Sequence, residues 1–334
     1  MLIAPARFGD GERLAGGWTR FAAIRLTIDG RDRVVPLGAV RSAVATLPAA
    51  VRARVAALCD ALVAPRPPLA GLDLARPHVM GILNVTPDSF SDGGRHPDPV
   101  AAAHAMVVAG AGIVDIGGES TRPGASDVAA ADELARVAPV FAGLRGSGIV
   151  TSIDSRKASV MAAALDAGAG IVNDVSALTF DAAAMALVAA RGAPIVLMHA
   201  QGTPATMQVA PAYDDVVADV FDWLEARIAA CVAAGIARHR IVADPGIGFG
   251  KTAAHNAALL RGIGAFHALG VPLLLGASRK AVIARLAGDG APVDARLGGS
   301  LALALHGVAH GVQIVRVHDV PETVQAMRVA IAVG

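Results

Sequence analysis

The feature that most constrains the fold is a phrase that recurs about eight times from residue 78 onward. Each copy contains a helical stretch, a glycine, a short run of β-branched apolar residues and then an abruptly polar end. Apolar strands that alternate with amphipathic helices indicate a parallel sheet buried on both faces. The eight runs are HVMGILNV, GIVDIGGEST, IVTSIDSRK, IVNDVSA, PIVLMHAQGT, IVADPGIGFGK, PLLLGASRK and IVRVHDV.

The number and length of these units predict a closed (β/α)8 barrel, the TIM barrel, over residues 76–334. Eight strand-helix units within about 255 residues match that fold. The glycines before the runs suit the left-handed residue that ends a helix. A doubly wound open sheet is the alternative, but it typically has fewer strands and gives no reason for eight polar ends.

The first 75 residues lack the repeat and predict a small N-terminal α+β extension. The stretch FAAIRLTIDGRDRVVPL indicates two short strands around an Asp-Gly turn. A helix is expected from about Val40 to Val63, and APRPPLAGL is a proline-rich linker. We interpret the extension as an appendage packed outside the barrel; a regulatory or partner surface is the alternative.

Composition excludes several classes of partner. The 334 residues are 54% hydrophobic and carry a net charge of +1, which suits one large buried core. Each apolar run meets a charge or turn before the roughly 18 residues that a membrane-spanning helix needs. The apolar patch near residue 1 is too short for a signal peptide, so we expect a soluble, cytoplasmic protein.

The residue types also argue against nucleic-acid and zinc binding. Only 3% of the residues are aromatic and no basic block is present, so no nucleic-acid surface is expected. Cys59 and Cys231 lie far apart in helical segments, where buried free thiols are expected rather than a disulfide or a zinc site. GIGFGKT resembles a phosphate loop, but Pro245 stands where that motif requires its first glycine.

Polar residues at the carboxyl ends of the strands are the strongest indication of function. In a barrel these ends converge on one mouth, where active sites of this fold lie. A single Asp or Asn at such a position is usually a cap or turn residue, but polar ends on all eight strands indicate a site. They are Asn84, Asp115, Asp154, Asn173 with Asp174, His199, Asp244, Ser278 with Lys280, and Arg316 with His318.

The side-chain types favour a ring joined to a polyanion. Asp154, Asn173 and Asp244 offer donors and acceptors suited to the edge of a nitrogen-rich heterocycle. The oxygen of Asn84 suits Mg²⁺ held mainly by water and substrate. Cations and hydroxyls suited to phosphate oxygens are Arg122, Lys280, Arg316, His318, Thr121 and Ser278.

From about His78 to its end, the chain resembles the dihydropteroate synthase family of folate biosynthesis. The resemblance rests on eight motifs in the family's order. It implies condensation of 6-hydroxymethyl-7,8-dihydropterin pyrophosphate with 4-aminobenzoate, with Mg²⁺ as the cofactor and a homodimer as the usual assembly. The motifs are GILNVTPDSFSDGG, DIGGESTRPGA, SIDSRKASV, GIVNDVSA, MHAQGTPATMQ, DPGIGFGKT, GASRK and RVHDV.

The resemblance also implies a role for each matching residue. The pterin would be bound by Asp154, Asn173, Asp244 and Lys280, with Met198, Phe249 and Gly276 around the ring. The pyrophosphate and its metal would be bound by Asn84, Thr121, Arg122, Arg316 and His318. The aminobenzoate subsite would contain Phe90, Pro123, Ser278 and Lys280, with Asp92 on the same loop as Phe90. The residues that act on charge during the reaction would be Arg122, Asp154, Lys280, Arg316 and His318.

Two other functions remain open from the sequence. A pterin-binding methyltransferase shares the barrel and the ring-binding residues, but it has no use for the NVTPDSFSDGG and STRPG loops. An inactive paralogue that only binds pterin would have little need for a complete leaving-group site. Pyrophosphate release from the pterin substrate distinguishes both from a synthase.

Overall fold

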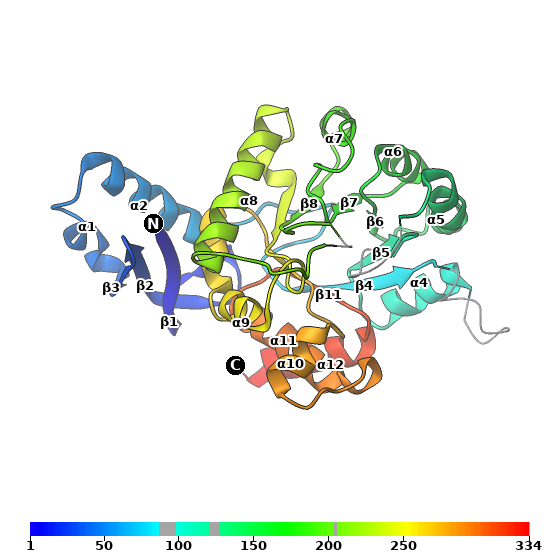
Figure 1. Cartoon of the computed structure of the whole chain (residues 1–334). Helices are drawn as coiled ribbons and strands as arrows, with labels where there is room; N and C mark the ends of the chain where they lie inside the picture. Colours follow the sequence, from blue (N-terminus) through cyan, green and yellow to red (C-terminus); the bar gives the residue numbers. More distant parts are fainter. Residues whose placement is uncertain (87–97, 121–126, 204–205, 334) are drawn as a thin grey trace.

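The computed structural model of the chain describes residues 1–86, 98–120, 127–203 and 206–333. Of the predicted site residues, Phe90, Asp92, Thr121, Arg122 and Pro123 lie outside these ranges. Figure 1 shows a barrel surrounded by helices, with the N-terminal extension on one side of it.

The eight predicted strands form one parallel sheet, in the order β10-β11-β4-β5-β6-β7-β8-β9. The two ends of this order meet through a parallel bridge between Ala243 and Leu273, and the Ala243 amide donates to the Pro272 carbonyl at 2.9 Å. The sheet is therefore closed, which confirms the predicted barrel. The strands are β4 (His78–Asn84), β5 (Ile113–Gly117), β6 (Thr151–Asp154), β7 (Ile171–Asp174), β8 (Ile195–Met198), β9 (Ile241–Asp244), β10 (Leu274–Leu275) and β11 (Ile314–Val317).

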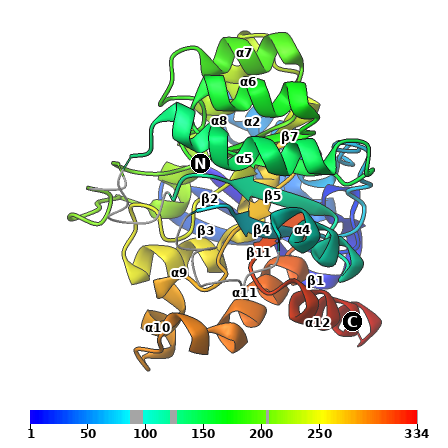
Figure 2. The ribbon, with the colours of Figure 1, turned by 90° about the vertical axis from the view of Figure 1, so that its right-hand side faces the viewer.

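Helices follow the strands and cover the outside of the barrel. Gly168 and Gly192 end α6 and α7 with positive φ of 109° and 58°, as the sequence pattern predicts. Figure 2 shows α5, α6 and α7 side by side over one flank. The α-helices are α4 (Pro99–Val108), α5 (Ala130–Leu144), α6 (Ala158–Ala167), α7 (Ala184–Arg191), α8 (Val216–Ala233), α9 (Ala253–Arg261), α10 (Ala281–Ala287), α11 (Leu297–Ala309) and α12 (Val320–Val333). Shorter 3-10 turns are η3 (Arg238–Arg240), η4 (Ile263–Leu269) and η5 (Val293–Ala295).

The extension contains the two predicted strands, β2 (Arg20–Ile28) and β3 (Arg31–Pro36), around an Asp29-Gly30 turn in which both φ angles are positive. A longer first strand, β1 (Leu2–Arg13), completes an antiparallel sheet and was not predicted. The prediction of one helix from Val40 to Val63 is wrong: α1 (Val40–Ala43) and α2 (Ala49–Val63) are separate, because Pro48 begins the second helix. The short turns η1 (Leu14–Gly16) and η2 (Leu37–Ala39) join these elements.

Specific contacts fix the extension to the barrel. The Trp18 indole donates to the Val308 carbonyl of α11 at 2.9 Å, and Arg66 donates to the His267 carbonyl of η4 at 2.7 Å. Leu69 and Leu74, which follow α2, pack into the apolar cluster at the amino ends of the strands. The segment from Leu69 to Leu74 therefore closes the bottom of the barrel.

Strand alternation places a polar layer directly above this apolar layer. Side chains two residues apart on a strand face the same side. The apolar layer contains Met80, Ile113, Ile171, Val196, Val242, Leu274 and Ile314. Two residues further along the same strands stand Ile82, Asp115, Asn173, Met198, Asp244, Gly276 and Arg316. Four of these seven side chains are charged or amide groups, so the barrel interior changes from hydrocarbon to a largely polar layer two residues further along the strands.

None of the helices in the described ranges is long and apolar enough to cross a membrane. The two cysteines are free thiols, as predicted; Cys231 is buried and Cys59 is half-buried.

Candidate active site

Arg316 joins two buried carboxylates at the centre of the barrel mouth. Its Nε donates to Asp115 Oδ2 and its Nη2 donates to Asp154 Oδ2, both at 2.6 Å. The same Asp115 oxygen accepts from Asn173 Nδ2 at 2.9 Å. Four predicted strand-end residues from β5, β6, β7 and β11 therefore form one network.

Burial controls the charge of this network. It raises the pKa of Asp154, and the negative charges of Asp115 and Glu133 act in the same direction, against the opposing Arg316 cation. The pKa of Arg316 is raised by the two carboxylates, against the effect of its own burial. Arg316 is thus a permanent cation, whereas Asp154 keeps its proton to a higher pH than an exposed carboxyl group does.

A second group surrounds Lys280, at the start of α10. Its Nζ donates to the Ile247 carbonyl at 2.6 Å and lies 4.4 Å from the centroid of the Phe249 ring. Burial lowers the pKa of Lys280 to about 8, although the Asp244 carboxylate opposes the change. Burial likewise raises the pKa of Asp244, with Lys280 as the main opposing charge. A cation, an aromatic face and a carboxylate therefore share one wall of the mouth.

Ser278 and His318 connect the ends of β10 and β11. The Ser278 hydroxyl lies 3.1 Å from His318 Nδ1, and it accepts from the His318 amide at 3.2 Å. Between Ser278 and Lys280, Arg279 has a positive φ of 57° and pairs with Asp319. Such a backbone conformation in a residue with a side chain persists only where its surroundings hold it.

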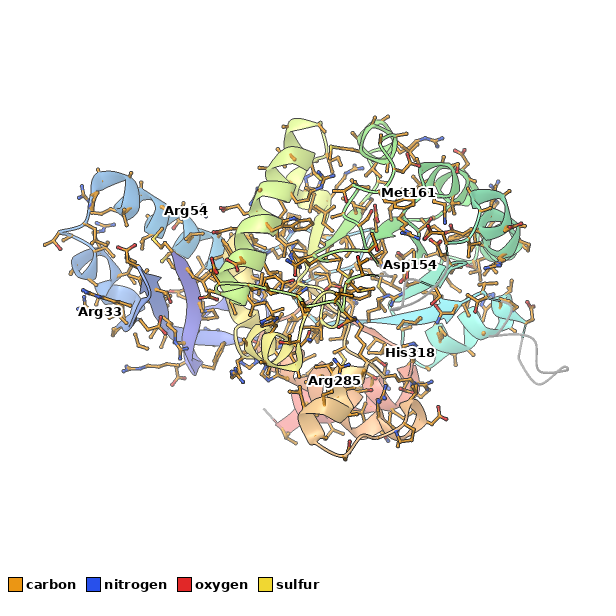
Figure 3. All side chains as sticks on the ribbon, in the orientation of Figure 1. Arg33, Arg54, Asp154, Met161, Arg285 and His318 are labelled. Carbon is orange, nitrogen blue, oxygen red and sulfur yellow. The ribbon has the colours of Figure 1, made fainter. Side chains whose placement is uncertain are left out.

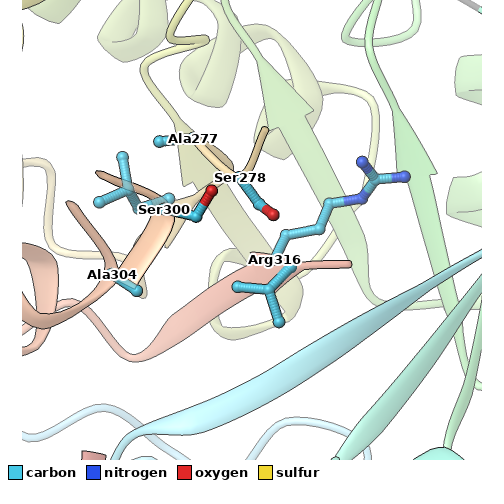
Figure 4. A pocket seen from close by; sticks show the side chains of 7 residues that line it. Ala277, Ser278, Ser300, Ala304 and Arg316 are labelled. Carbon is cyan, nitrogen blue, oxygen red and sulfur yellow. The ribbon is translucent and has the colours of Figure 1, made fainter. Parts of the chain in front are cut away.

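Figure 4 shows a small pocket lined by Ala277, Ser278, Ser300, Ala304 and Arg316. The Arg316 side chain extends from it toward the neighbouring strands. Figure 3 shows Asp154 and His318 in the barrel, whereas Arg33 and Arg54 lie in the extension, away from the mouth.

The remaining predicted ring contacts also lie in this mouth. Met198 is buried at the end of β8. A Cβ at Gly276 would lie 3.9 Å from Asp244 Oδ2 and 3.8 Å from Arg316 Cβ, so a larger side chain there would project into the mouth. Asn84 is half-buried at the end of β4 and stands in register beside Gly117, which stands beside Asp154.

Two strand-end residues have contacts that the sequence did not assign. Asp115 carries no predicted role, yet it holds both Arg316 and Asn173 and is fully buried. The strand spacing could have predicted that Asp115 faces the barrel interior. It stands two residues after Ile113 of the apolar layer, and side chains two residues apart on a strand face the same side. Asp174, in contrast, accepts from the Ser176 and Leu178 amides and acts as a turn cap.

A closed barrel with this mouth defines a class of enzyme that binds a flat, polar heterocycle beside a polyanion. The family model described as pterin binding enzyme matches residues 80–318. The chain is 50% identical over 262 residues to the dihydropteroate synthase of Escherichia coli strain K12, which covers 77% of this chain and 92% of that protein.

Solved structures agree with this relationship. Dihydropteroate synthase from Xanthomonas albilineans, solved with 4-aminobenzoic acid, is 47% identical with a TM-score of 0.75, covering 80% of this chain and 98% of that one. The Yersinia pestis dihydropteroate synthase, solved with a sulfonamide drug complex, is 46% identical with a TM-score of 0.74, covering 78% and 96%. The chain belongs to the dihydropteroate synthase family of pterin-binding enzymes.

Proposed function

We propose that the protein condenses 6-hydroxymethyl-7,8-dihydropterin pyrophosphate with 4-aminobenzoate to give 7,8-dihydropteroate and pyrophosphate. The observation that carries this proposal is one network above an apolar layer, in which Arg316 donates to Asp115 and Asp154 and Asn173 donates to Asp115. It provides hydrogen bonds for a ring and a cation for an anion within one mouth. The family relationship gives the two substrates their identity.

The pterin edge would be bound by Asp154, Asn173 and Asp244. Each offers an oxygen, and Asn173 also offers an amide donor. Phe249, Met198 and Gly276 would lie around the heterocycle, with Lys280 binding it beside Asp244. Burial of Asp154, Asn173 and Asp244 supports this role, because hydrogen bonds and charges act more strongly where water is excluded.

Arg316, His318 and Ser278 would bind the departing pyrophosphate. Arg316 Nε and Nη2 are occupied by carboxylates, whereas its Nη1 makes no hydrogen bond within the described ranges. Arg122 and Thr121 are proposed for the same role from their motif alone.

The bond between the pterin methylene carbon and oxygen breaks with its electron pair on pyrophosphate. The aminobenzoate nitrogen then forms the new bond to that carbon and releases a proton to solvent.

This order of events needs two opposite charges to be stabilised in one site. Arg316 and His318 would stabilise the leaving pyrophosphate, and the carboxylates of Asp154 and Asp244 would stabilise the pterin cation. No strong base is needed, because the aniline nitrogen is neutral at working pH. Phe90, Asp92, Pro123, Ser278 and Lys280 are proposed to border the aminobenzoate.

The residues present fit Mg²⁺ at Asn84. The side-chain oxygen of Asn84 is a hard ligand, and the described part of the chain has no cluster of three or more His, Cys, Asp or Glu that could hold a metal by itself. Such a site suits an ion held mainly by substrate oxygens and water. When bound, Mg²⁺ would supply charge that stabilises the leaving pyrophosphate.

We also propose a cytoplasmic homodimer. Exposed apolar residues on the last helix, Val329 and Ile331, provide surface that a second copy could cover. Light scattering after size-exclusion chromatography would test the assembly, and a monomer at micromolar concentration would contradict it.

Pyrophosphate release tests the activity. Purified protein with both substrates and Mg²⁺ should release pyrophosphate, and omission of Mg²⁺ should abolish the release. A protein that binds the pterin without releasing pyrophosphate would be a binding paralogue. One that needs a methyl acceptor for turnover would be a methyltransferase.

A further inference from the structure

The loop that follows β9 packs directly on the backbone that follows β8. A Cβ at Gly246 would lie 1.9 Å from the His199 carbonyl oxygen, and one at Gly250 would lie 2.5 Å from the Gln201 carbonyl oxygen. Both glycines also have positive φ, 68° and 62°. Only glycine allows this approach, so residues 246–250 and 199–201 form one packed unit.

The Lys251 side chain ties this unit together from inside. Its Nζ lies 2.9 Å from His199 Nδ1 and donates to the carbonyls of Phe249, Gly246 and His199 at 2.9, 3.0 and 3.3 Å. Lys251 is only 1% exposed, and no carboxylate is among these partners. Burying an ammonium group is costly unless its donors are satisfied, so these acceptors determine where the side chain can lie.

His199 is suited to receive this donor. Its ring packs edge-on against Trp223, with 5.0 Å between the centroids. Burial, together with the Lys251 charge, lowers the pKa of His199 to about 3, so the ring is neutral and its Nδ1 is free to accept. Burial also lowers the pKa of Lys251 to about 7.

The tied loop carries groups from the proposed pterin site. The Gly246 amide donates to Asp244 Oδ1 at 2.7 Å. The Ile247 carbonyl accepts from Lys280 Nζ, which also lies over the Phe249 ring. On the other side of the unit, Met198 directly precedes His199. A shift of this loop would therefore move side chains that follow or end three neighbouring strands, β8, β9 and β10.

We propose that Lys251, through its contact with His199, is a positioning residue that holds the ring-binding wall of the mouth in place. This inference rests on the proposed function, since it assigns Asp244, Phe249, Lys280 and Met198 to the pterin. Lys251 itself does not touch the substrate. Its loss should weaken pterin binding more than aminobenzoate binding, whereas a lysine that only stabilises the fold would affect neither in the folded protein.

The first test replaces Lys251 with methionine, which keeps the length and removes the donor. Binding of 7,8-dihydropteroate, measured by calorimetry on the full chain, should weaken by about tenfold or more because the wall loses its fixed position. The KM for aminobenzoate should change by less than about twofold. Faster hydrogen exchange of the Gly248 and Phe249 amides would report the loosened loop independently of ligand.

A matched control separates positioning from stability. Leu62→Ala removes buried side-chain volume from α2, in the extension, and should lower the melting temperature without weakening dihydropteroate binding. Equal weakening in Leu62→Ala and Lys251→Met would overturn the positioning role.

Two variants of His199 test the same inference if Lys251→Met does not fold. His199→Gln retains an acceptor for Lys251, whereas His199→Leu removes it. The glutamine variant should bind dihydropteroate within about threefold of wild type and the leucine variant about tenfold more weakly. Wild-type affinity in both variants would overturn the inference alone, while a wild-type protein that binds no dihydropteroate would overturn the proposed function with it.

Discussion

The Arg316 guanidinium stands between two buried carboxylates, so its removal has two separable effects. Arg316→Ala leaves Asp115 and Asp154 without their cation, and breaking such a buried pair typically costs about 3–5 kcal/mol of stability. It also removes positive charge from the proposed leaving-group site. Turnover should therefore fall by about 100-fold or more, with the aminobenzoate KM changed by less than about threefold.

Steady-state kinetics with each substrate varied in turn would check this expectation. The variant should be assayed well below its own melting temperature, so that lost stability does not count as lost turnover. Unchanged turnover, or a loss confined to the aminobenzoate KM, would show that Arg316 does not act on the leaving group.

The lowered pKa of Lys280 predicts that a rise in pH affects activity and stability in opposite directions. Its pKa in the folded protein is about 8, so its charge is present at pH 7 and is lost as the pH rises through 8. The value of kcat/KM should fall above about pH 8, because it reports groups of the free enzyme. In the unfolded chain the lysine keeps its proton to higher pH. The unfolded state thus binds more protons between pH 8 and 10, and the stability contribution of Lys280 rises with pH.

The two halves of this prediction need separate measurements. A pH profile of kcat/KM should be compared with urea unfolding at the same pH values. Lys251, whose pKa is also lowered, contributes to stability in the same direction. A kcat/KM that stays flat to pH 9.5 would contradict a charged Lys280 in the site.

The extension and its linker make different contributions to the barrel. Deleting residues 1–64 removes the sheet, α2 and the Trp18 contact, but leaves Leu69 and Leu74 in the bottom cluster. Deleting residues 1–75 removes these two leucines as well. We expect the shorter deletion to retain turnover within about threefold at lower thermal stability, and the longer one to lose an additional several kcal/mol from two emptied core positions.

Thermal unfolding and turnover of both deletions would test this difference. Equal stability of the two would show that Leu69 and Leu74 are not part of the barrel core. Loss of turnover in a folded 1–64 deletion would indicate that the extension acts on the mouth.

Strand repeats were easier to predict than local breaks. Each of the eight strands follows from an apolar run with a polar end, because burial on both faces demands that pattern. The strand β1 escaped prediction because its second half, GDGER, is polar and exposed, and its pairing with β2 is interrupted between Phe8 and Glu12. The break between α1 and α2 follows from Pro48, a local signal that a helical pattern over the whole segment obscured.

The site could be predicted as a set of residues but not as a network. Strand ends meet at one mouth in any such barrel, which is why Asp154, Asn173 and Arg316 could be grouped from sequence. That one Asp115 oxygen serves both Arg316 and Asn173 depends on side-chain directions that only the folded structure gives. The role of Lys251 was not predicted because its partners are mainly backbone carbonyls. Every residue type has such a carbonyl, so the sequence does not indicate these contacts.

The family relationship also predicts the response to sulphonamides. These drugs resemble aminobenzoate, and the Yersinia pestis relative was solved with a sulfonamide drug complex. Inhibition should be competitive with aminobenzoate and should not compete with the pterin substrate. Initial rates at several concentrations of both substrates would show this, and the lack of any inhibition would indicate an altered aminobenzoate subsite.

A single-turnover reaction with ¹⁵N-labelled 4-aminobenzoate tests the central claim most directly. Enzyme in excess over the pterin pyrophosphate, with Mg²⁺, should convert it into 7,8-dihydropteroate that carries the label, together with an equal amount of pyrophosphate. Mass spectrometry would measure the labelled dihydropteroate. Treatment with pyrophosphatase followed by a phosphate assay would measure the pyrophosphate. A protein that binds the pterin substrate but forms no labelled dihydropteroate would contradict the account.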